Sequence, residues 1–231
     1  MRATNHVKIF SGGAMRPLMA EIVPRFERAD EAVVEIEFRL TSVLEKAIED
    51  GTVFDIAVLP RPELDELVKH GTIAPAGTAD IARSTIGLAV RAGAPKPDIG
   101  SVSALRHSLV QACSIAYSDG PSGAYTAAVL EKLGIAEEMR PKTRLTSGPV
   151  AELVASGEAD IGIQQIVAIL PVEGAELVGP LPSELQNVIV YAAGLANRPR
   201  NSALARAFIA FTATDEAKRL IRAAGLESGR G

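Results

Sequence analysis

The stretch VKIFSGGAM, residues 7–15, decides the fold. Its first four residues are apolar except for Lys8, and they predict a short buried strand. The small residues that follow predict a tight loop. Over 14–28 the apolar residues recur at helical spacing, so the loop leads directly into a helix. A strand, a loop and a helix in this order form the unit of α/β folds with parallel sheets.

The same alternation continues along the rest of the chain. Strands are predicted over 33–38, 54–59, 84–90, 114–117, 161–165 and 188–195. Helices are predicted over 43–49, 62–69, 103–111, 124–133, 150–155, 202–212 and 216–224. We therefore expect an α/β protein whose mainly parallel sheets are flanked by helices.

The two halves of the chain resemble each other. FSGG at 10–13 is similar to YSDG at 117–120, and both follow an apolar run and precede an amphipathic helix. Further along, Asp55 and Asp160 each follow a glycine and precede an apolar strand. Because order and spacing are shared, we expect two related lobes rather than one sheet. The predicted lobes are 1–83 with 196–231, and 91–187, joined by crossing strands at 84–90 and 188–195.

Each strand–loop–helix junction has a physical consequence for ligand binding. The first N–H groups of a helix have no partner inside the helix, and the helix dipole adds partial positive charge there. Small loop residues let a ligand approach these N–H groups closely. Two such junctions facing one cleft between the lobes would bind a small anion. The alternative is that both loops are ordinary turns.

Composition excludes several classes of function. Twenty-four basic and 28 acidic residues give a net charge of −4, which disfavours binding to nucleic acid. The single cysteine, Cys113, excludes an internal disulfide and is expected to be a small buried residue. Three scattered histidines predict no metal site, and no phosphate-loop or Ser-His-Asp pattern is present. We expect neither a metal nor a cofactor.

The location of the protein is predicted from its N-terminal residues. No signal-like apolar segment precedes residue 7, and no run is long enough to span a membrane. The chain as written is therefore expected to be cytoplasmic. If a signal peptide has been removed, the expectation changes to the periplasm, with a transporter as partner.

These stretches resemble the periplasmic molybdate-binding protein family, which has the type 2 solute-binding fold. The matching segments are 7–15, 41–59, 114–134 and 150–165. The resemblance implies two lobes, joined by two crossing strands, that close on a bound anion.

Matching the family's anion contacts to this sequence shows replacements. The first-loop serine falls on Ala14, with Ser11 nearby, and the second falls on Thr41-Ser42. The loop of the second lobe falls on 118–124, with Ser122 at the contacting position. The family's Val-Arg pair falls on Ser147-Gly148 and its tyrosine on Gln165. Because several oxyanion contacts are replaced, we expect an organic carboxylate rather than molybdate.

A branch of this fold, the aconitate isomerases, is enzymatic. The chain resembles that branch in layout, with GGAM at 12–15, AVLP at 57–60 and GPLPSELQ at 179–186. The alternative function is therefore a cofactor-free isomerase of an aconitate-like polycarboxylate. Its catalytic residues are not assigned; the candidate proton carriers are Glu35, Tyr117, Asp119 and Tyr125.

The residues expected to bind the anion come from both halves. They are Ser11, Gly12, Gly13, Ala14, Arg39, Thr41, Ser42, Ser118, Ser122, Gly123, Ala124, Tyr125, Ser147, Gln164 and Gln165.

Several of these residues also have a purely structural interpretation. Thr41 and Ser42 have the residue types of a helix N-cap, and Arg39 can pair with Glu35 or Glu37. The Tyr125 hydroxyl can point into the cleft or be satisfied within the protein. Asp55 and Asp160 are expected to form turns rather than to bind ligand.

Overall fold

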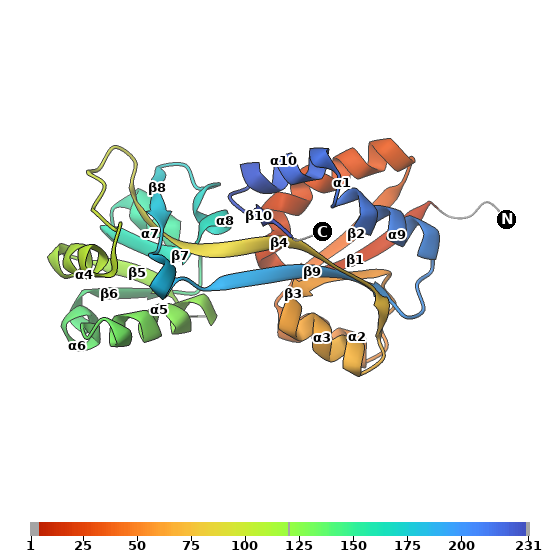
Figure 1. Ribbon diagram of the computed structural model, residues 1–231, viewed down its shortest axis with the longest axis horizontal. Helices are drawn as coiled ribbons and strands as arrows, with labels where there is room; N and C mark the ends of the chain where they lie inside the picture. The colour runs from red at the N-terminus through yellow and green to blue at the C-terminus, as the bar shows by residue number, and fades with distance from the viewer. Residues whose placement is uncertain (1–4, 120, 230–231) are drawn as a thin grey trace. The chain divides into compact units, whose positions relative to one another are not determined.

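The computed structural model describes residues 5–119 and 121–229, without the side chains of residues 121 and 122. It consists of two compact units. Unit 1 contains Met1–Arg83 and Ile189–Gly231, and unit 2 contains Ser84–Val188. The chain passes from one unit to the other within strand β4 (Ile73–Arg91) and at the start of strand β9 (Val188–Ala196) (Figure 1).

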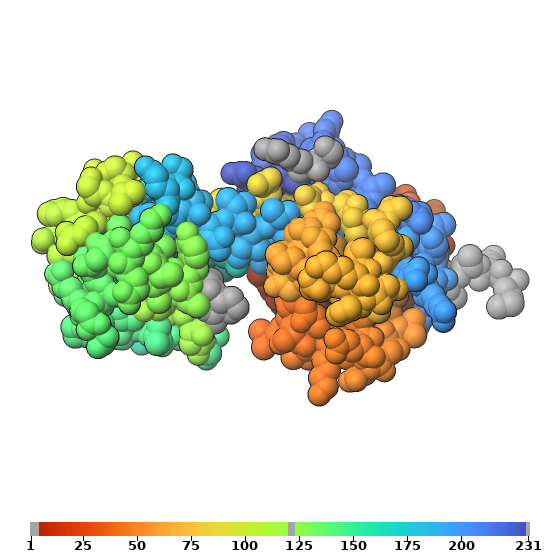
Figure 2. All heavy atoms as spheres, turned by 60° about the horizontal axis from the view of Figure 1, so that its bottom comes forward, coloured from red at the N-terminus to blue at the C-terminus, as the bar shows by residue number. Residues whose placement is uncertain are grey.

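Unit 1 is built on a mixed sheet covered by helices on both faces (Figure 1). Strand β1 (His6–Gly12) lies between β2 (Val33–Arg39) and β3 (Ile56–Pro60), parallel to both, and β9 runs antiparallel to β3. One face carries α1 (Arg16–Asp30), α9 (Ser202–Phe211) and α10 (Asp215–Ala223). The other carries α2 (Thr41–Glu49) and α3 (Arg61–Lys69), which lie at the front of unit 1 in Figure 2.

Consecutive residues of β1 supply the two cores of unit 1, because side chains alternate across a strand. Phe10 faces α2 and α3 and stacks on Phe54, with ring centroids 5.3 Å apart. On the α1 side, the Phe26 ring meets the Phe208 ring edge-on at 5.1 Å. These buried aromatic side chains fix α1 and α2 on opposite faces of the same three parallel strands.

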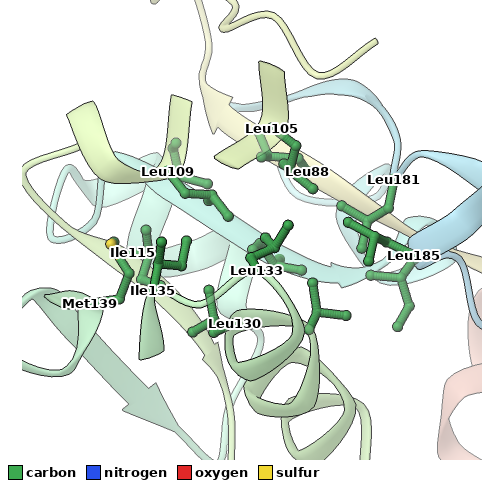
Figure 3. Close-up of a cluster of buried hydrophobic side chains, with 14 of the residues drawn as sticks. Leu88, Leu105, Leu109, Ile115, Leu130, Leu133, Ile135, Met139, Leu181 and Leu185 are labelled. Carbon is green, nitrogen blue, oxygen red and sulfur yellow. The ribbon is translucent and has the colours of Figure 1, made fainter. Parts of the chain in front are cut away.

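Unit 2 repeats the parallel arrangement. Strand β5 (Ile115–Ser118) lies between β6 (Thr143–Thr146) and β7 (Ile161–Gln165) and is parallel to both. Strand β4 pairs antiparallel with β7 and with β8 (Ala175–Pro180). The helices are α4 (Val102–Gln111), α5 (Pro121–Lys132), α6 (Ala136–Met139), α7 (Val150–Ser156) and α8 (Ile166–Ile169). Leu88, Leu105, Leu109, Leu130 and Leu133 converge in the buried cluster that Figure 3 shows.

The fold class expected from the sequence is confirmed, with antiparallel strands added to the parallel ones. Strands β6, β8 and the two-residue β10 (Glu227–Ser228) were not predicted. Thr143–Thr146 has the sequence TRLT and its side chains are exposed or half-buried, so it lacks the apolar pattern of a buried strand. The prediction for Cys113 is wrong, because this cysteine is exposed. No helix in the described part of the chain is long and apolar enough to cross a bilayer.

The two aspartates of the internal repeat make equivalent contacts. One carboxylate oxygen of Asp55 accepts the Lys8 N–H at 2.8 Å, and the other accepts the Arg200 N–H at 2.5 Å. In unit 2, one carboxylate oxygen of Asp160 accepts the N–H groups of Cys113 at 2.8 Å and Ser114 at 3.1 Å. Each aspartate therefore ties the start of its own strand to the start of the neighbouring parallel strand.

The two aspartate contacts differ in burial, which predicts unequal contributions to stability. Asp55 is 0% exposed, whereas Asp160 lies at the surface. Asp55→Ala removes a fully buried carboxylate from part-buried hydrogen bonds to backbone N–H groups and should lower the free energy of unfolding by about 2–4 kcal/mol. Asp160→Ala should cost about 1 kcal/mol or less, because water replaces the carboxylate. Urea unfolding followed by circular dichroism measures both values. Equal losses of unfolding free energy would contradict the claim that burial makes the Asp55 contact the stronger one.

Candidate functional site

The carboxyl edge of the unit 1 sheet brings three strand–helix junctions together. Strand β1 leads into the short 3-10 helix η1 (Gly13–Met15) and then into α1, β2 leads into α2, and β3 leads into α3. Because the three strands are parallel neighbours, their carboxyl ends lie along one edge. A Cβ atom on Gly12 would lie 3.7 Å from the Thr41 hydroxyl oxygen. The start of α2 therefore lies against the loop that follows β1.

The long helices differ in how their N-termini are satisfied. Helices α4, α9 and α10 each begin with a side-chain cap: Ser101, Asn201 and Thr214 accept the backbone N–H three residues on. In contrast, α1, α2 and α3 have Met15, Leu40 and Pro60 at the cap position. Within the described residues, none of these three makes a side-chain cap hydrogen bond.

The uncapped helices all follow parallel strands at the carboxyl edge. A side-chain cap contributes about 1 kcal/mol to a helix, so three adjacent helices without one are conspicuous. The Arg16 N–H at the start of α1 already donates to the Gly13 carbonyl, and Pro17 and Pro62 have no N–H group. The N–H groups available to an outside acceptor therefore lie in the η1 turn and in the first turn of α2. Chemically, this edge can bind a small negatively charged group.

The interpretation of Thr41 and Ser42 as an N-cap is wrong. Leu40 holds the cap position with extended backbone angles (φ −61°, ψ 141°), and the two hydroxyl residues are the first residues of α2. Thr41 is half-buried and Ser42 is exposed. Both residues therefore add a hydroxyl group and a first-turn N–H group to the carboxyl edge.

The loop after β1 presents backbone more than side chains. Ser11 is 0% exposed, and its hydroxyl donates to the Gly12 carbonyl at 3.3 Å. Gly12 is also buried, Gly13 is exposed and Ala14 is half-buried. The exposed part of the junction is therefore the backbone of the η1 turn.

Two arginines lie near this edge, and only one of them was predicted from the sequence to contact the ligand. Arg39, an expected ligand residue, pairs with Glu37 at 2.5 Å, which is its structural alternative. Arg16, which sequence reasoning missed, is the first residue of α1 and stacks over the Phe38 ring at 4.2 Å. The signal that could have found it is a cation in the first turn, where the helix dipole is unfavourable to positive charge.

The corresponding junction of unit 2 lies between β5 and α5. A Cβ atom on Gly123 would overlap the Ser118 carbonyl, so this helical turn packs directly on the end of β5. The Asp119 N–H donates to the Thr146 carbonyl at 3.0 Å, which joins the ends of β5 and β6. Ala124 is exposed at the start of α5. The side chain of Ser122 lies outside the described residues.

Three of the remaining predicted residues of unit 2 make hydrogen bonds within the protein, and the fourth, Ser147, is exposed. Gln164 is 5% exposed and accepts the Ala151 N–H at 3.2 Å, so it satisfies the first turn of α7 from a neighbouring strand. Gln165 accepts the Ser84 hydroxyl at 2.9 Å. The Tyr125 hydroxyl donates to the Leu185 carbonyl at 3.2 Å, its structural alternative. Ser147 is exposed in the turn before α7.

The predicted proton carriers are scattered over both units. Tyr117 lines a cavity of about 270 Å³ beside α5 in unit 2. In unit 1, Glu35 pairs with Lys8 at 3.2 Å on the face of the sheet that carries α2. Asp119 is exposed.

A carboxyl pair near α2 was not predicted. Burial raises the pKa of Glu45, and the charges of Glu63 and Glu49 raise it further. One carboxylate oxygen of Glu63 is buried without a hydrogen-bond partner among the described residues. Glu45 lies one turn after Thr41, so the two side chains share a face of α2.

Comparisons with known proteins cover nearly the whole chain. Residues 7–227 match the model of the family described as bacterial extracellular solute-binding protein. An aconitate isomerase from Pseudomonas sp. is 29% identical over 226 residues, covering 95% of this chain and 86% of the relative.

Two solved structures show the same fold. One is a substrate-binding domain assigned to a molybdenum ABC transporter of Clostridium difficile, with a TM-score of 0.83 and 17% identity, covering 96% of this chain and 98% of that chain. The other is the periplasmic molybdate-binding protein of Azotobacter vinelandii, with a TM-score of 0.75 and 18% identity, covering 95% of this chain and 98% of that chain.

Proposed function

The chain belongs to the bacterial extracellular solute-binding protein family, and we propose that it binds a small organic carboxylate at the starts of α1 and α2. The observation that carries this proposal is the contrast between capped and uncapped helices. Helices α4, α9 and α10 have side-chain caps at their N-termini, whereas α2 and the η1 turn that leads into α1 have none.

The contacts proposed in unit 1 are neutral donors. The backbone of Gly13 and Ala14 and the hydroxyl and N–H groups of Thr41 and Ser42 suit a carboxylate oxygen. In unit 2, the N-terminal turn of α5 with Ser118, Ser122, Gly123 and Ala124, and the exposed Ser147, stay predicted contacts. That one ligand contacts both units also stays a prediction.

Two considerations favour an organic acid over an inorganic oxyanion. Positions that contact the oxyanion in molybdate-binding proteins are occupied here by Ala14, Gly148 and Gln165. The curated relative is described as acting on aconitate, a tricarboxylate.

The family is described as extracellular, which favours the periplasmic alternative for the location of this protein.

Binding by the α2 junction is tested with tricarballylate (propane-1,2,3-tricarboxylate) and molybdate in titration calorimetry. We expect tricarballylate to bind the parent protein and Thr41→Val to weaken it about tenfold, because a hydrogen bond to a charged group is lost. Thr52→Val, at an exposed position beyond the other end of α2, is the matched control and should leave the affinity unchanged.

A parent protein that binds molybdate but not tricarballylate would contradict the carboxylate assignment. Equal affinities for the Thr41→Val and Thr52→Val variants would contradict the site.

A second candidate function is a cofactor-free isomerase of an aconitate-like acid, and the similarity to aconitate isomerase favours it. In such a reaction a base removes a proton from the CH₂ carbon of the substrate. The electron pair moves into the adjacent C–C bond, the double bond shifts, and a proton returns to the former vinylic carbon. Positive charge at helix N-termini would stabilise the carboxylate that holds the developing negative charge.

We propose Glu45 as the proton carrier of this second candidate. The Glu45 carboxyl group shares a face of α2 with Thr41. Its pKa is raised in the direction of neutral pH, and a carboxylate with a higher pKa is a more effective base.

Proton exchange distinguishes the two candidate functions. With trans-aconitate in heavy water, an isomerase would incorporate deuterium at the CH₂ carbon and form the cis isomer, both visible by NMR. Glu45→Gln should then abolish exchange while tricarballylate still binds, and Glu49→Gln, one turn further along α2, should retain both. Binding without any exchange by the parent protein would exclude the isomerase.

A further inference from the structure

We propose that Arg16 binds a second carboxylate of the ligand and so makes the site selective for di- and tricarboxylates. This inference rests on the proposed function and names its substrate class. The evidence for it is the position of the Arg16 guanidinium. Arg16 was not among the residues predicted from the sequence to bind the ligand.

Arg16 lies at the carboxyl edge of the unit 1 sheet. It is the first residue of α1, directly after the η1 turn. Its guanidinium carbon lies 4.2 Å from the centroid of the Phe38 ring. Phe38 is the β2 residue paired with Ser11 of β1, so the stacked guanidinium lies beside the loop that starts at Ser11.

The electrostatics of this position point to an external anion. A cation at the start of a helix is opposed by the positive end of the dipole. Arg61 occupies the same position in α3, but there Asp80 and Asp65 neutralise it. Arg16 has no carboxylate partner among residues 5–119 and 121–229, and Phe38 is its neighbour instead.

Arg39 does not provide a positive charge on the α1 face of the sheet. Phe38 and Arg39 are consecutive in β2, so their side chains point to opposite faces of the sheet. Arg16 contacts Phe38 on the α1 face, whereas Arg39 pairs with Glu37 on the other face. The cation available at this junction is therefore Arg16.

The chemistry of a stacked guanidinium matches a carboxylate. Stacking on an aromatic ring fixes the plane of the guanidinium while its N–H groups point outward from the rim. Two of these N–H groups can donate in parallel to the two oxygens of a carboxylate. A compact oxyanion is satisfied by the first-turn N–H groups alone, whereas a polycarboxylate also needs a donor for its next carboxylate.

The test measures the dissociation constant of tricarballylate for the parent protein and for matched variants. Arg16→Ala should weaken binding about 10- to 100-fold, and Arg16→Lys should recover part of the loss, because charge remains without the fork geometry. Arg28→Ala removes the same charge from the last turn of α1 and should change the affinity less than twofold. Circular dichroism of each variant verifies that it folds.

A double-mutant cycle tests how Phe38 acts. If Phe38 positions the guanidinium, Phe38→Leu should weaken binding in the parent protein and have no further effect in the Arg16→Ala variant. Independent, additive losses would overturn the positioning by Phe38.

Two other outcomes separate this inference from the function on which it rests. If Arg16→Ala binds tricarballylate as tightly as Arg28→Ala does, the assignment of Arg16 is wrong and the carboxylate site stands. If the parent protein binds no tricarballylate, the proposed function fails and the role of Arg16 fails with it.

Discussion

Every helix must find hydrogen-bond acceptors for its first N–H groups, and this chain meets that constraint in two different ways. Three long helices away from the proposed site carry the acceptor themselves: Ser101, Asn201 and Thr214 cap α4, α9 and α10, whereas the short helices α6, α7 and α8 have no side-chain cap. Where three helices follow the parallel strands of unit 1, the chain supplies Met15, Leu40 and Pro60, which make no side-chain cap. The proposed site is the place where the chain leaves this requirement to a ligand.

Precise placement of these N-termini depends on the strands that lead to them. Asp55 fixes the start of β3 against the start of β1 with a buried carboxylate, and Asp160 does the same for β7 and β5. Both contacts lie at the amino ends of the strands, so neither aspartate occupies a carboxyl edge. In unit 1, the edge that Asp55 stabilises is therefore opposite the edge at which we propose that the ligand binds.

Much of the fold follows from the periodicity of the sequence. Apolar runs, helical spacing and helix-ending glycines predict the strands and helices near the carboxyl edges, because those segments are buried on regular faces. Strand β6 escaped prediction because its exposed residues carry no such pattern. The internal repeat was visible because the same junction requires small residues in both halves.

The individual contacts of the site were harder to predict, because each depends on a choice between near neighbours. Thr41 has the residue type of a cap, but the backbone of Leu40 takes that position. Gln164 accepts a hydrogen bond from the first turn of α7, and this tertiary contact cannot be predicted from a local sequence pattern. Arg39 and Arg16 were separable only once the pairing of β1 and β2 showed which face each side chain occupies.

The central claim is that the first-turn N–H groups at the carboxyl edge bind the negative charge of the ligand. Amide chemical shifts in a ¹⁵N-labelled sample test it most directly during titration with tricarballylate. The account predicts the largest changes at Gly13, Ala14, Thr41 and Ser42, with none at the capped N–H groups of Ala104, Leu204 and Ala217. Saturable shifts confined to other parts of unit 1, with those four amides unmoved, would contradict it.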